Sequence, residues 1–264
     1  MLELKGVRKV FNTGTVNEKV ALDGIDLHLL PGDFVTIIGG NGAGKSTMLN
    51  TIAGAYLVDA GTVTVNGTDV TFMSEAKRAK FLGRVFQDPR FGTATDMQID
   101  ENLALAARRG KRRTLAWGIT HEERELFRER LARLGLGLEN RLSDKVGLLS
   151  GGQRQALTLL MATIQSPDVL LLDEHTAALD PKTAALVLEI TEEVVTENNL
   201  TTLMVTHNMH DAIRMGNRLI MMSAGKIIFD VRGEEKSRLQ ISDLMKKFEE
   251  AAGVEFDNDR MLLG

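Results

Sequence analysis

The sequence predicts a mixed α/β fold with an antiparallel, β-rich start and an inserted helical segment. Short apolar runs of buried-strand type recur at 34–38, 168–173 and 202–206, and a helical pattern lies between the last two, as in sheets with helical crossovers. The stretch at 61–70 shows β-branched alternation, which is typical of antiparallel strands. From about residue 95 to 150 the chain becomes charged and helix-periodic.

The first elements follow from turn residues and hydrophobic period. Residues 21–30 place Ile25, Leu27 and Leu29 on one face of a strand. Pro31-Gly32 then turns the chain into the buried strand at 34–38, and a glycine-rich loop follows. The helix after this loop ends at Gly54 and carries Met48, Leu49, Ile52 and Ala53 at helical spacing.

Later elements are marked in the same way. Asn66-Gly67 inside the β-branched stretch at 61–70 predicts a hairpin. A helix is expected from Pro181 towards Glu197, and residues 219–230 predict a second hairpin.

Two segments stand apart from the α/β core. The helical insertion at about 95–150 carries an apolar stripe of Leu126, Phe127, Leu131 and Leu134. The charged tail at 231–264 follows the main domain at 1–230, and Leu244, Met245 and Phe248 predict one short docked helix in it.

Composition limits the possible functions. The 264 residues include 32 Lys+Arg and 36 Asp+Glu, a net charge of -4, so the overall positive field of a nucleic-acid binder is missing. Cysteine is absent, which excludes disulfides and thiolate chemistry. No apolar stretch approaches the roughly 18 residues of a membrane span. We expect a cytoplasmic protein that acts without nucleic acid and reaches a membrane only through a partner.

The strongest chemical signal is the stretch IIGGNGAGKSTML at 37–49. Gly39, Gly44, Lys45 and Ser46 fit the phosphate-loop pattern G-x-x-x-x-G-K-[ST]. In such a loop backbone N–H groups face phosphate oxygens, the lysine reaches the β and γ phosphates, and the serine hydroxyl ligates Mg²⁺. The other loop residues expected at the nucleotide are Asn41, Gly42, Ala43 and Thr47.

An acidic pair is the expected companion of such a loop, and Asp173 with Glu174 follows the apolar run VLLL. Taken alone, an acidic pair after a strand is more often a helix cap. With the phosphate loop upstream, Asp173 is predicted to hold the metal and Glu174 to polarise the attacking water.

The stretch LLSGGQRQ beginning at Leu148 predicts a second anion site. Ser150 would cap a helix whose first turn contains Gly151 and Gly152, so that N–H groups are exposed at its positive end. One nucleotide loop and two phosphate-binding helix ends in one chain suggest that the second end serves the nucleotide of another subunit.

The order and spacing of these motifs resemble the ATP-binding cassette (ABC) ATPase family over residues 1–230. The resemblance implies a P-loop NTPase with a RecA-like core, an antiparallel β subdomain and an inserted α-helical subdomain, using ATP and Mg²⁺. It assigns adenine stacking to Phe11, a metal and water contact to Gln87, the γ-phosphate switch to His207, and dimer-interface crossing to Asp180. Gln153 belongs to the signature stretch that meets nucleotide. From the residues alone, Phe11 in the core, Gln87 at the surface and a structural His207 remain the alternatives.

The sequence departs from the family pattern at His175, where proline is common, and at Ala178, where serine is common. All residues with a direct chemical role are present, so a hydrolysing site is expected. Two copies would close head to tail around two Mg-ATP, with Ser150, Gly151 and Gly152 capping the γ phosphate held by the partner.

Three uses of such a motor compete. The first is the ATPase subunit of a membrane transporter, resembling bacterial uptake systems that work with a permease and a solute-binding protein and carry amino-acid-like solutes. A motor for an exporter or for lipoprotein extrusion is the alternative within that class. A soluble ABC ATPase of DNA repair or translation, and a nucleotide-binding regulatory module, are the other two.

A basic run lies inside the helical insertion, and it is either a solvated loop or a surface for lipid headgroups or permease loops. It consists of Arg108, Arg109, Lys111, Arg112 and Arg113, followed by Trp117.

Overall fold

The computed structural model describes residues 1–111 and 118–252, and its strands form two sheets. The strands are β1 (Leu2–Phe11), β2 (Lys19–Leu29), β3 (Phe34–Gly39), β4 (Ala60–Val65), β5 (Thr68–Asp69), β6 (Leu82–Val85), β7 (Val169–Asp173), β8 (Thr202–Val205), β9 (Arg218–Ser223) and β10 (Lys226–Arg232). The α-helices are α1 (Lys45–Ala53), α2 (Glu75–Arg78), α3 (Ile99–Ala107), α4 (His121–Ala132), α5 (Gly151–Thr163), α6 (Pro181–Glu197), α7 (Met209–Arg214), α8 (Gly233–Ser237) and α9 (Ile241–Ala252). Short 3₁₀ turns are η1 (Pro89–Gly92), η2 (Leu138–Asn140) and η3 (Val146–Leu148).

The first sheet is antiparallel, in the order β2-β1-β4-β5. In β2, Ile25, Leu27 and Leu29 are buried while their neighbours face out, as the alternation predicts. Asn66 and Gly67 both have positive φ between β4 and β5, the backbone of a tight hairpin turn. The antiparallel start and the first hairpin are therefore confirmed.

The second sheet has the order β10-β9-β3-β8-β7-β6, parallel except for β10 at one edge. The last hairpin, β9 with β10, is the one predicted at 219–230. All four residues of β8 are buried, as expected for a parallel strand covered on both faces. Because β3, β6, β7 and β8 run the same way, the segments after them meet along one edge of the sheet.

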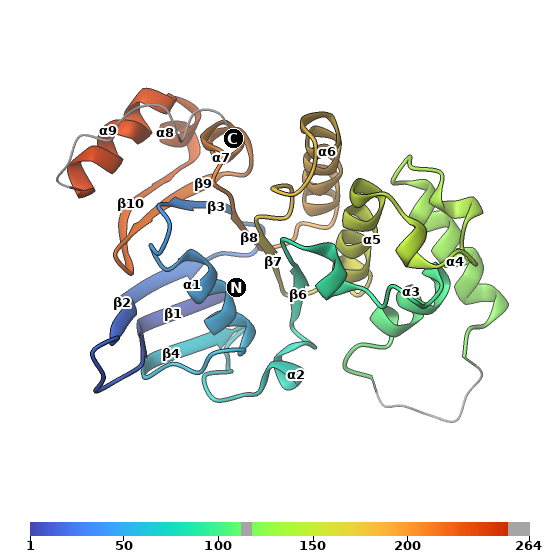
Figure 1. Cartoon of the computed structure of the whole chain (residues 1–264), viewed down its shortest axis with the longest axis horizontal. Helices are drawn as coiled ribbons and strands as arrows, with labels where there is room; N and C mark the ends of the chain where they lie inside the picture. The colour runs from blue at the N-terminus through green and yellow to red at the C-terminus, as the bar shows by residue number, and fades with distance from the viewer. Residues whose placement is uncertain (112–117, 253–264) are drawn as a thin grey trace.

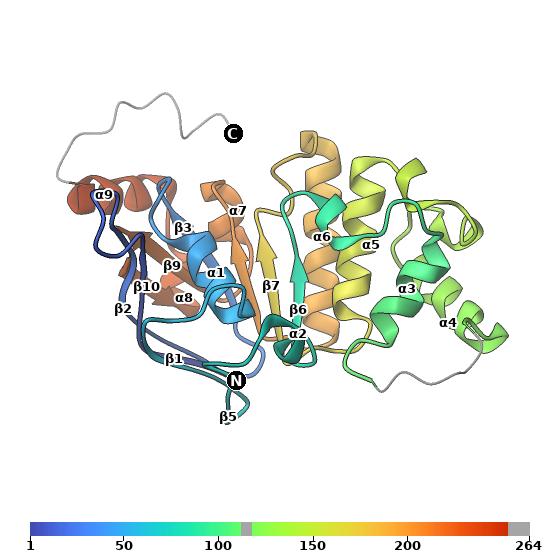
Figure 2. The same cartoon turned by 60° about the horizontal axis from the view of Figure 1, so that its bottom comes forward.

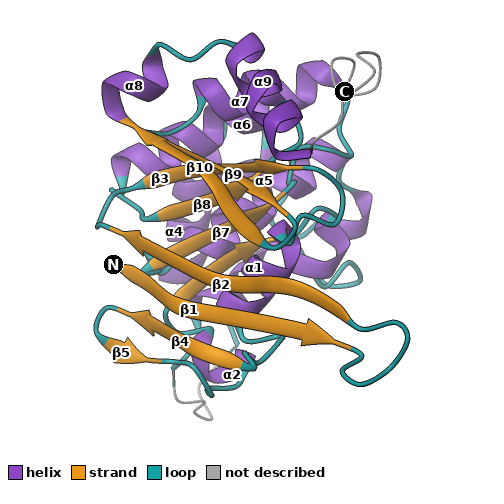
Figure 3. Ribbon diagram, turned by 90° about the vertical axis from the view of Figure 1, so that its left-hand side faces the viewer, coloured by secondary structure: helices purple, strands orange, loops and turns teal. Residues whose placement is uncertain are grey.

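Helix α1 lies between the two sheets, as Figure 3 shows. One apolar cluster joins both sheets to this helix through its buried residues Met48, Leu49 and Ile52. The helix ends at Gly54, whose φ of 86° confirms the predicted C-terminal stop. The phosphate-loop helix is thus fixed by packing on two sides.

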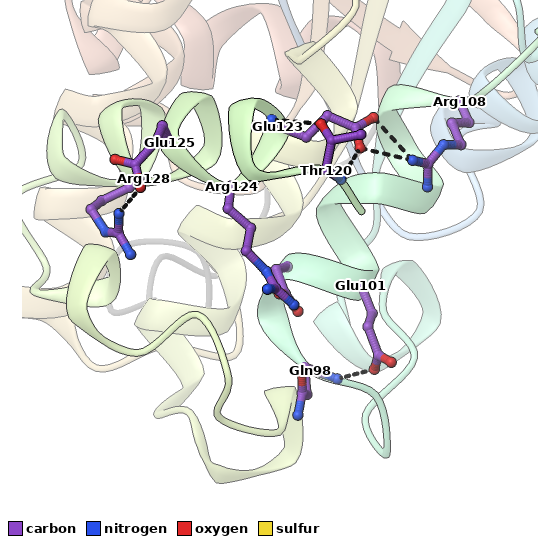
Figure 4. Close-up of polar contacts among 9 residues, drawn as sticks. Gln98, Glu101, Arg108, Thr120, Glu123, Arg124, Glu125 and Arg128 are labelled. Atoms are coloured by element: carbon purple, nitrogen blue, oxygen red, sulfur yellow. Dashed lines mark hydrogen bonds and ion pairs between the residues drawn. The ribbon is translucent and has the colours of Figure 1, made fainter. Parts of the chain in front are cut away.

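Helices α3 and α4 lie at the end of the molecule farthest from the antiparallel sheet, beyond α5 (Figures 1 and 2). Capping boxes begin both helices, Gln98 with Glu101 and Thr120 with Glu123, and Figure 4 draws these contacts. Asp100 is fully buried and accepts from Arg124 Nε at 3.0 Å, which joins α3 to α4.

The predicted apolar stripe of this region was wrong at one position. Phe127, Leu131 and Leu134 are buried, whereas the Leu126 side chain is 46% exposed. Phe127, Leu131 and Leu134 follow the i, i+4, i+7 spacing of a helical face, and a residue one position earlier is rotated about 100° away from that face.

Part of the basic run is used inside the molecule. Arg108 pairs with Glu123 at 2.9 Å, and Arg109 donates to the carbonyl oxygen of Ala162 at 3.1 Å. Lys111 is exposed. Arg112, Arg113 and Trp117 lie outside the described residues.

The tail begins with α8 and α9, and α9 packs on α7. Leu244 is buried, and Met245 and Phe248 pack against the same apolar cluster, which confirms the predicted docked helix. In α8, which precedes this helix, the ammonium of Lys236 is buried against the carbonyl oxygens of Met215 and Gly216, at the end of α7. Burial lowers the pKa of Lys236 to about 8.

Candidate functional site

The glycine-rich loop connects the end of β3 to the start of α1. At Gly44, φ is 104° and a Cβ would lie 2.5 Å from the carbonyl oxygen of Ala21, so only glycine fits. The Lys45 side chain is folded back into the loop, where Nζ donates to the carbonyl oxygens of Gly39 at 2.7 Å and Gly40 at 3.2 Å. Burial, opposed by the charges of the acidic pair, lowers the pKa of this ammonium.

A cavity of about 210 Å³ lies over this loop. Its lining combines the phosphate loop with residues from β1, β2 and the segment after β7: Phe11, Lys19, Ala21, Asn41, Gly42, Ala43, Gly44, Lys45, Ser46, Thr47 and Glu174. The structure thus brings together an aromatic ring, a lysine-bearing loop and a carboxylate. The Phe11 ring is partly buried and packs edge-on against Tyr56 at 5.2 Å between centroids, so one face is held in place.

Lys19 was missed by sequence reasoning. It pairs with Phe11 across β1 and β2, and its Nζ lies 3.2 Å from where a Cβ of Gly42 would stand. A second cation therefore stands over the loop beside Lys45. The cross-strand register places Lys19 opposite Phe11, but this register is seen in the structure and has no mark in the sequence.

Asp173, at the end of β7, faces Ser46 at the start of α1. Ser46 Oγ donates to Asp173 Oδ1 at 3.4 Å. Burial raises the pKa of Asp173, and the nearby guanidinium of Arg84 opposes this shift. Within the described parts of the chain, no group of three or more His, Asp or Glu side chains could hold a metal alone. A hydroxyl with one carboxylate fits Mg²⁺, which proteins commonly bind through one or two carboxylates and the phosphates of a substrate.

Arg84 is the other residue that the sequence did not reveal. Its Nη2 lies 3.7 Å from Asp173 Oδ2 and donates to Asn50 Oδ1 at 2.8 Å, while its guanidinium stacks on Phe86 at 4.4 Å. The two oxygens of Asp173 are thus turned in different directions, one to Ser46 and one to Arg84. No local pattern marks Arg84, because it meets Asp173 through the pairing of β6 with β7.

Glu174 and His207 lie side by side at the carboxyl edge of the sheet. His207 Nδ1 is 3.6 Å from Glu174 Oε2, with side-chain exposures of 49% and 22%. The neighbouring His207 imidazole lowers the pKa of Glu174, and the Glu174 carboxylate raises the pKa of His207. The backbone of Glu174 is left-handed, with φ of 45°, a strained conformation for a residue with a side chain.

The second predicted anion site lies outside the cavity lining. Ser150 caps α5 by accepting from the N–H of Gln153, and the Gln153 side chain accepts in return from the Ser150 N–H. The Gln153 amide is further held from outside the helix, because its Nε2 donates to the carbonyl oxygen of Leu136 at 3.3 Å and its Oε1 accepts from Arg141 Nη1 at 3.4 Å.

This helix end packs on the turn before α6. A Cβ on Gly152 would lie 2.1 Å from Thr183 Cγ2, and one on Gly151 would lie 3.2 Å from Leu179 Cδ2. Asp180 caps α6 by accepting from the N–H of Thr183 at 3.1 Å. Ser150, Gly151, Gly152 and Asp180 therefore gather in a cluster of their own, apart from the phosphate loop.

Gln87 follows β6, the strand beside β7, and its side chain is exposed. It does not line the cavity.

In the described chain, no helix has the length and apolar character needed to cross a membrane.

Comparisons with known proteins agree with this geometry. The family model described as ABC transporter matches residues 22–177. A tyrosine transport ATP-binding protein of Clostridioides difficile is 44% identical over 251 residues, covering 95% of this chain and 100% of that protein. A lipoprotein-releasing system ATP-binding protein of Caulobacter vibrioides is 36% identical, covering 88% of this chain and 96% of that protein.

A solved structure of a dimeric ATP-binding cassette in a post-hydrolysis state, bound to ADP and Pi, aligns with a TM-score of 0.75 and 29% identity. It covers 88% of this chain and 98% of that one. The predicted P-loop fold, ATP binding and ATPase activity are confirmed by this agreement. The predicted role as the ATPase subunit of an ABC importer is likewise confirmed, and lipoprotein release has less support. The chain belongs to the ABC transporter family, in which it is an ATP-binding and ATP-hydrolysing subunit.

Proposed function

We propose that this chain powers the uptake of an amino acid by hydrolysing Mg-ATP between two copies of itself. The observation that carries the proposal is that the phosphate loop, Phe11 and Glu174 line one and the same cavity. Similarity to a tyrosine transport ATP-binding protein over its whole length supports an aromatic amino acid as cargo.

The polar and aromatic residues in and beside the cavity have distinct roles in this proposal. Phe11 stacks on adenine, Lys45 and the N–H groups of residues 39–47 bind the β and γ phosphates, and Lys19 adds a further positive charge over the loop. Ser46 and Asp173 would hold Mg²⁺, assisted by Gln87. When bound, the ion would neutralise charge on the phosphates.

Hydrolysis depends on Glu174 and His207. The Glu174 carboxylate, kept ionised by His207, accepts hydrogen bonding from the attacking water and polarises it. The pKa of the His207 imidazole is raised. His207 lies beside Glu174 at the carboxyl edge of the sheet, where it donates a hydrogen bond to the γ phosphate. Glu174 is therefore ionised near neutral pH, and its charge favours the protonated form of His207, in which both ring nitrogens donate.

A second copy completes each site. The Ser150 helix end and Asp180 do not line the cavity of their own chain, although the positive N-terminal end of a helix such as α5 suits an anion. Head-to-tail closure would bring that helix end onto the γ phosphate held by the partner. The dimeric cassette structure supports this arrangement.

A permease is the proposed membrane partner, with a solute-binding protein delivering the cargo, and it would hold this chain at the inner face of the cell membrane. Two large apolar side chains stand exposed on segments flanking the site, Phe91 on η1 at 78% and Leu148 on η3 at 70%. The Gly147 N–H of η3 donates to the carbonyl oxygen of Thr95, in the loop that follows η1, at 2.8 Å. Exposed apolar side chains of this size are typical of protein contact surfaces.

The test of the catalytic proposal is Glu174→Gln, with Glu193→Gln as the control because Glu193 is an exposed carboxylate on α6. We expect Glu174→Gln to abolish hydrolysis and to trap an ATP-bound dimer in size-exclusion chromatography with light scattering. Glu193→Gln should behave as wild type. A Glu174→Gln protein that still hydrolyses ATP, or that stays monomeric with wild type at high Mg-ATP, would contradict the proposal.

The cargo is tested separately in cells of the host that lack the chromosomal copy. Uptake of labelled tyrosine should return with the wild-type chain and not with Glu174→Gln. Unchanged tyrosine uptake in the deletion strain, with loss of another solute, would reassign the cargo and leave the ATPase proposal intact.

A further inference from the structure

His175 follows Glu174 directly, yet it points away from the cavity into the protein. Its side chain is buried, with 2% exposure, and the cavity lining includes Glu174 but not His175. A buried imidazole needs a hydrogen-bond partner, because an unsatisfied ring nitrogen in the interior is destabilising. The partner is Thr191 on α6, whose Oγ1 lies 3.1 Å from His175 Nε2.

The direction of this hydrogen bond follows from the neighbouring atoms. The Thr191 hydroxyl donates its own hydrogen to the carbonyl oxygen of Val187 at 2.7 Å, so its oxygen is left to accept. His175 Nε2 therefore carries a hydrogen and donates it. Thr191 is fully buried, so no water competes for this contact.

Glu174 needs such an anchor because its backbone is strained. Its φ of 45° places it in the left-handed region, which is unfavourable for a residue with a Cβ unless the surroundings enforce it. On one side the Glu174 N–H donates to the carbonyl oxygen of Val205 in β8 at 3.0 Å. On the other side the chain is held through His175 and Thr191.

We propose that His175 is a positioning residue that fixes the direction of the Glu174 carboxylate by tying its backbone to α6 through Thr191. The inference rests on the proposed role of Glu174 in hydrolysis. Without the tie, the strained backbone can relax towards an ordinary conformation and carry the carboxylate away from the attacking water. A displacement of about 1 Å at a reacting group is enough to lower a rate by about 100-fold.

Substitutions at Thr191 distinguish a positioning role of His175 from a role in packing alone. Thr191→Val keeps the branched shape but removes the hydroxyl that His175 needs, whereas Thr191→Ser keeps the hydroxyl. If His175 only filled space, the serine variant would be the more damaging one, since it leaves a cavity.

The matched control is Thr158→Val in α5. Thr158 is also buried in a helix, at 3% exposure, and its hydroxyl donates to the carbonyl oxygen of Gln155 at 2.7 Å. Thr158→Val thus removes a comparable hydrogen bond from a threonine hydroxyl to a helix carbonyl oxygen, without affecting an imidazole.

The experiment measures kcat and KM for Mg-ATP, together with binding of a fluorescent ATP analogue, for the four proteins. We expect Thr191→Val to lower kcat at least tenfold with KM and nucleotide affinity within twofold of wild type. Thr191→Ser and Thr158→Val should keep most of the wild-type kcat. A Thr191→Val protein with kcat within twofold of wild type, or equal losses in Thr158→Val, would overturn the inference.

A second pair of variants covers the case in which Thr191→Val does not fold. His175→Gln retains an N–H donor at the end of a side chain of similar reach, and His175→Met does not. We expect kcat to survive in the first and to fall in the second. Equal kcat in both would overturn the inference. Glu174→Gln, measured in parallel, separates failure of the proposed catalytic role of Glu174 from failure of the positioning role of His175. If Glu174→Gln remains active, the catalytic role fails. If it is inactive while all other variants are normal, only the role of His175 fails.

Discussion

Replacing Gly152 with alanine is expected to lower ATP hydrolysis by about 100-fold through a clash within the chain itself. An added Cβ would lie 2.1 Å from Thr183 Cγ2, and an ordinary contact begins at 3.4 Å, so the first turn of α5 and the start of α6 must separate by 3.4 − 2.1 = 1.3 Å. Thr183 is β-branched and held in a helix, so its side chain gives way poorly. A misplacement of about 1 Å can reduce a rate by about 100-fold.

The fold should survive this change. Alanine is favoured over glycine in a helix by about 1 kcal/mol, which offsets part of an overpacking penalty of about 1–3 kcal/mol. The phosphate loop is distant in sequence and belongs to another cluster, so we expect the isolated chain to bind ATP with unchanged affinity. The loss should appear in kcat and in ATP-driven dimer formation.

The decisive assay is rescue. Thr183→Ser removes Cγ2 and keeps the backbone N–H that Asp180 caps, so Gly152→Ala combined with Thr183→Ser should recover most of the wild-type kcat. Thr183→Ser alone is the control and should be nearly wild type. If the double variant is as inactive as Gly152→Ala, the added methyl acts against the nucleotide of the partner and the intramolecular reasoning is refuted. Full activity of Gly152→Ala would refute it as well.

Three further outcomes concern stability. Arg78→Met should lower the free energy of unfolding in urea by about 3 kcal/mol, because the buried guanidinium makes four hydrogen bonds to backbone carbonyls beside the end of α1; a loss below about 1 kcal/mol would contradict this. Since Glu174 raises the pKa of His207 above 6.5 and His207 lowers that of Glu174 below 4.5, their pairing stabilises the fold fully between these values and is lost as pH rises through the raised pKa. The stability difference between wild type and His207→Gln should therefore stay under about 1 kcal/mol, because both side chains are partly exposed, and should fade as pH rises through the raised pKa of His207. A difference constant with pH would argue against the pair. Lys236 has a pKa of about 8 against 10.5 in an exposed lysine, so the unfolded chain binds more protons between these values and stability rises with pH across them; Lys236→Met should abolish this rise in pH-dependent urea melts.

Much of the fold and the phosphate loop could be predicted because their signals are local. Asn66-Gly67 requires positive φ, Gly54 ends a helix, and the loop before Lys45 is a contiguous pattern with one physical use. Such signals depend on neighbours within a few residues, so they do not require the tertiary structure.

The residues that sequence reasoning missed depend on contacts between distant segments. Arg84 meets Asp173 only because β6 and β7 are adjacent in the sheet, and the chain between them spans the whole helical insertion. Leu126 failed for a different reason: a stripe of apolar residues fixes a helical face only to within one residue, and burial of Phe127 decides which neighbour turns outward.

The left-handed backbone at Glu174 also has a consequence for laboratory evolution. Glycine would adopt that conformation without the penalty of roughly 1–2 kcal/mol that a side chain incurs there. A library selected only for thermal tolerance should therefore enrich Glu174→Gly, and each round would yield sturdier chains that no longer turn over ATP. Directed evolution of this protein needs a selection for transport in every round, because at residue 174 thermal stability and ATP hydrolysis favour different amino acids.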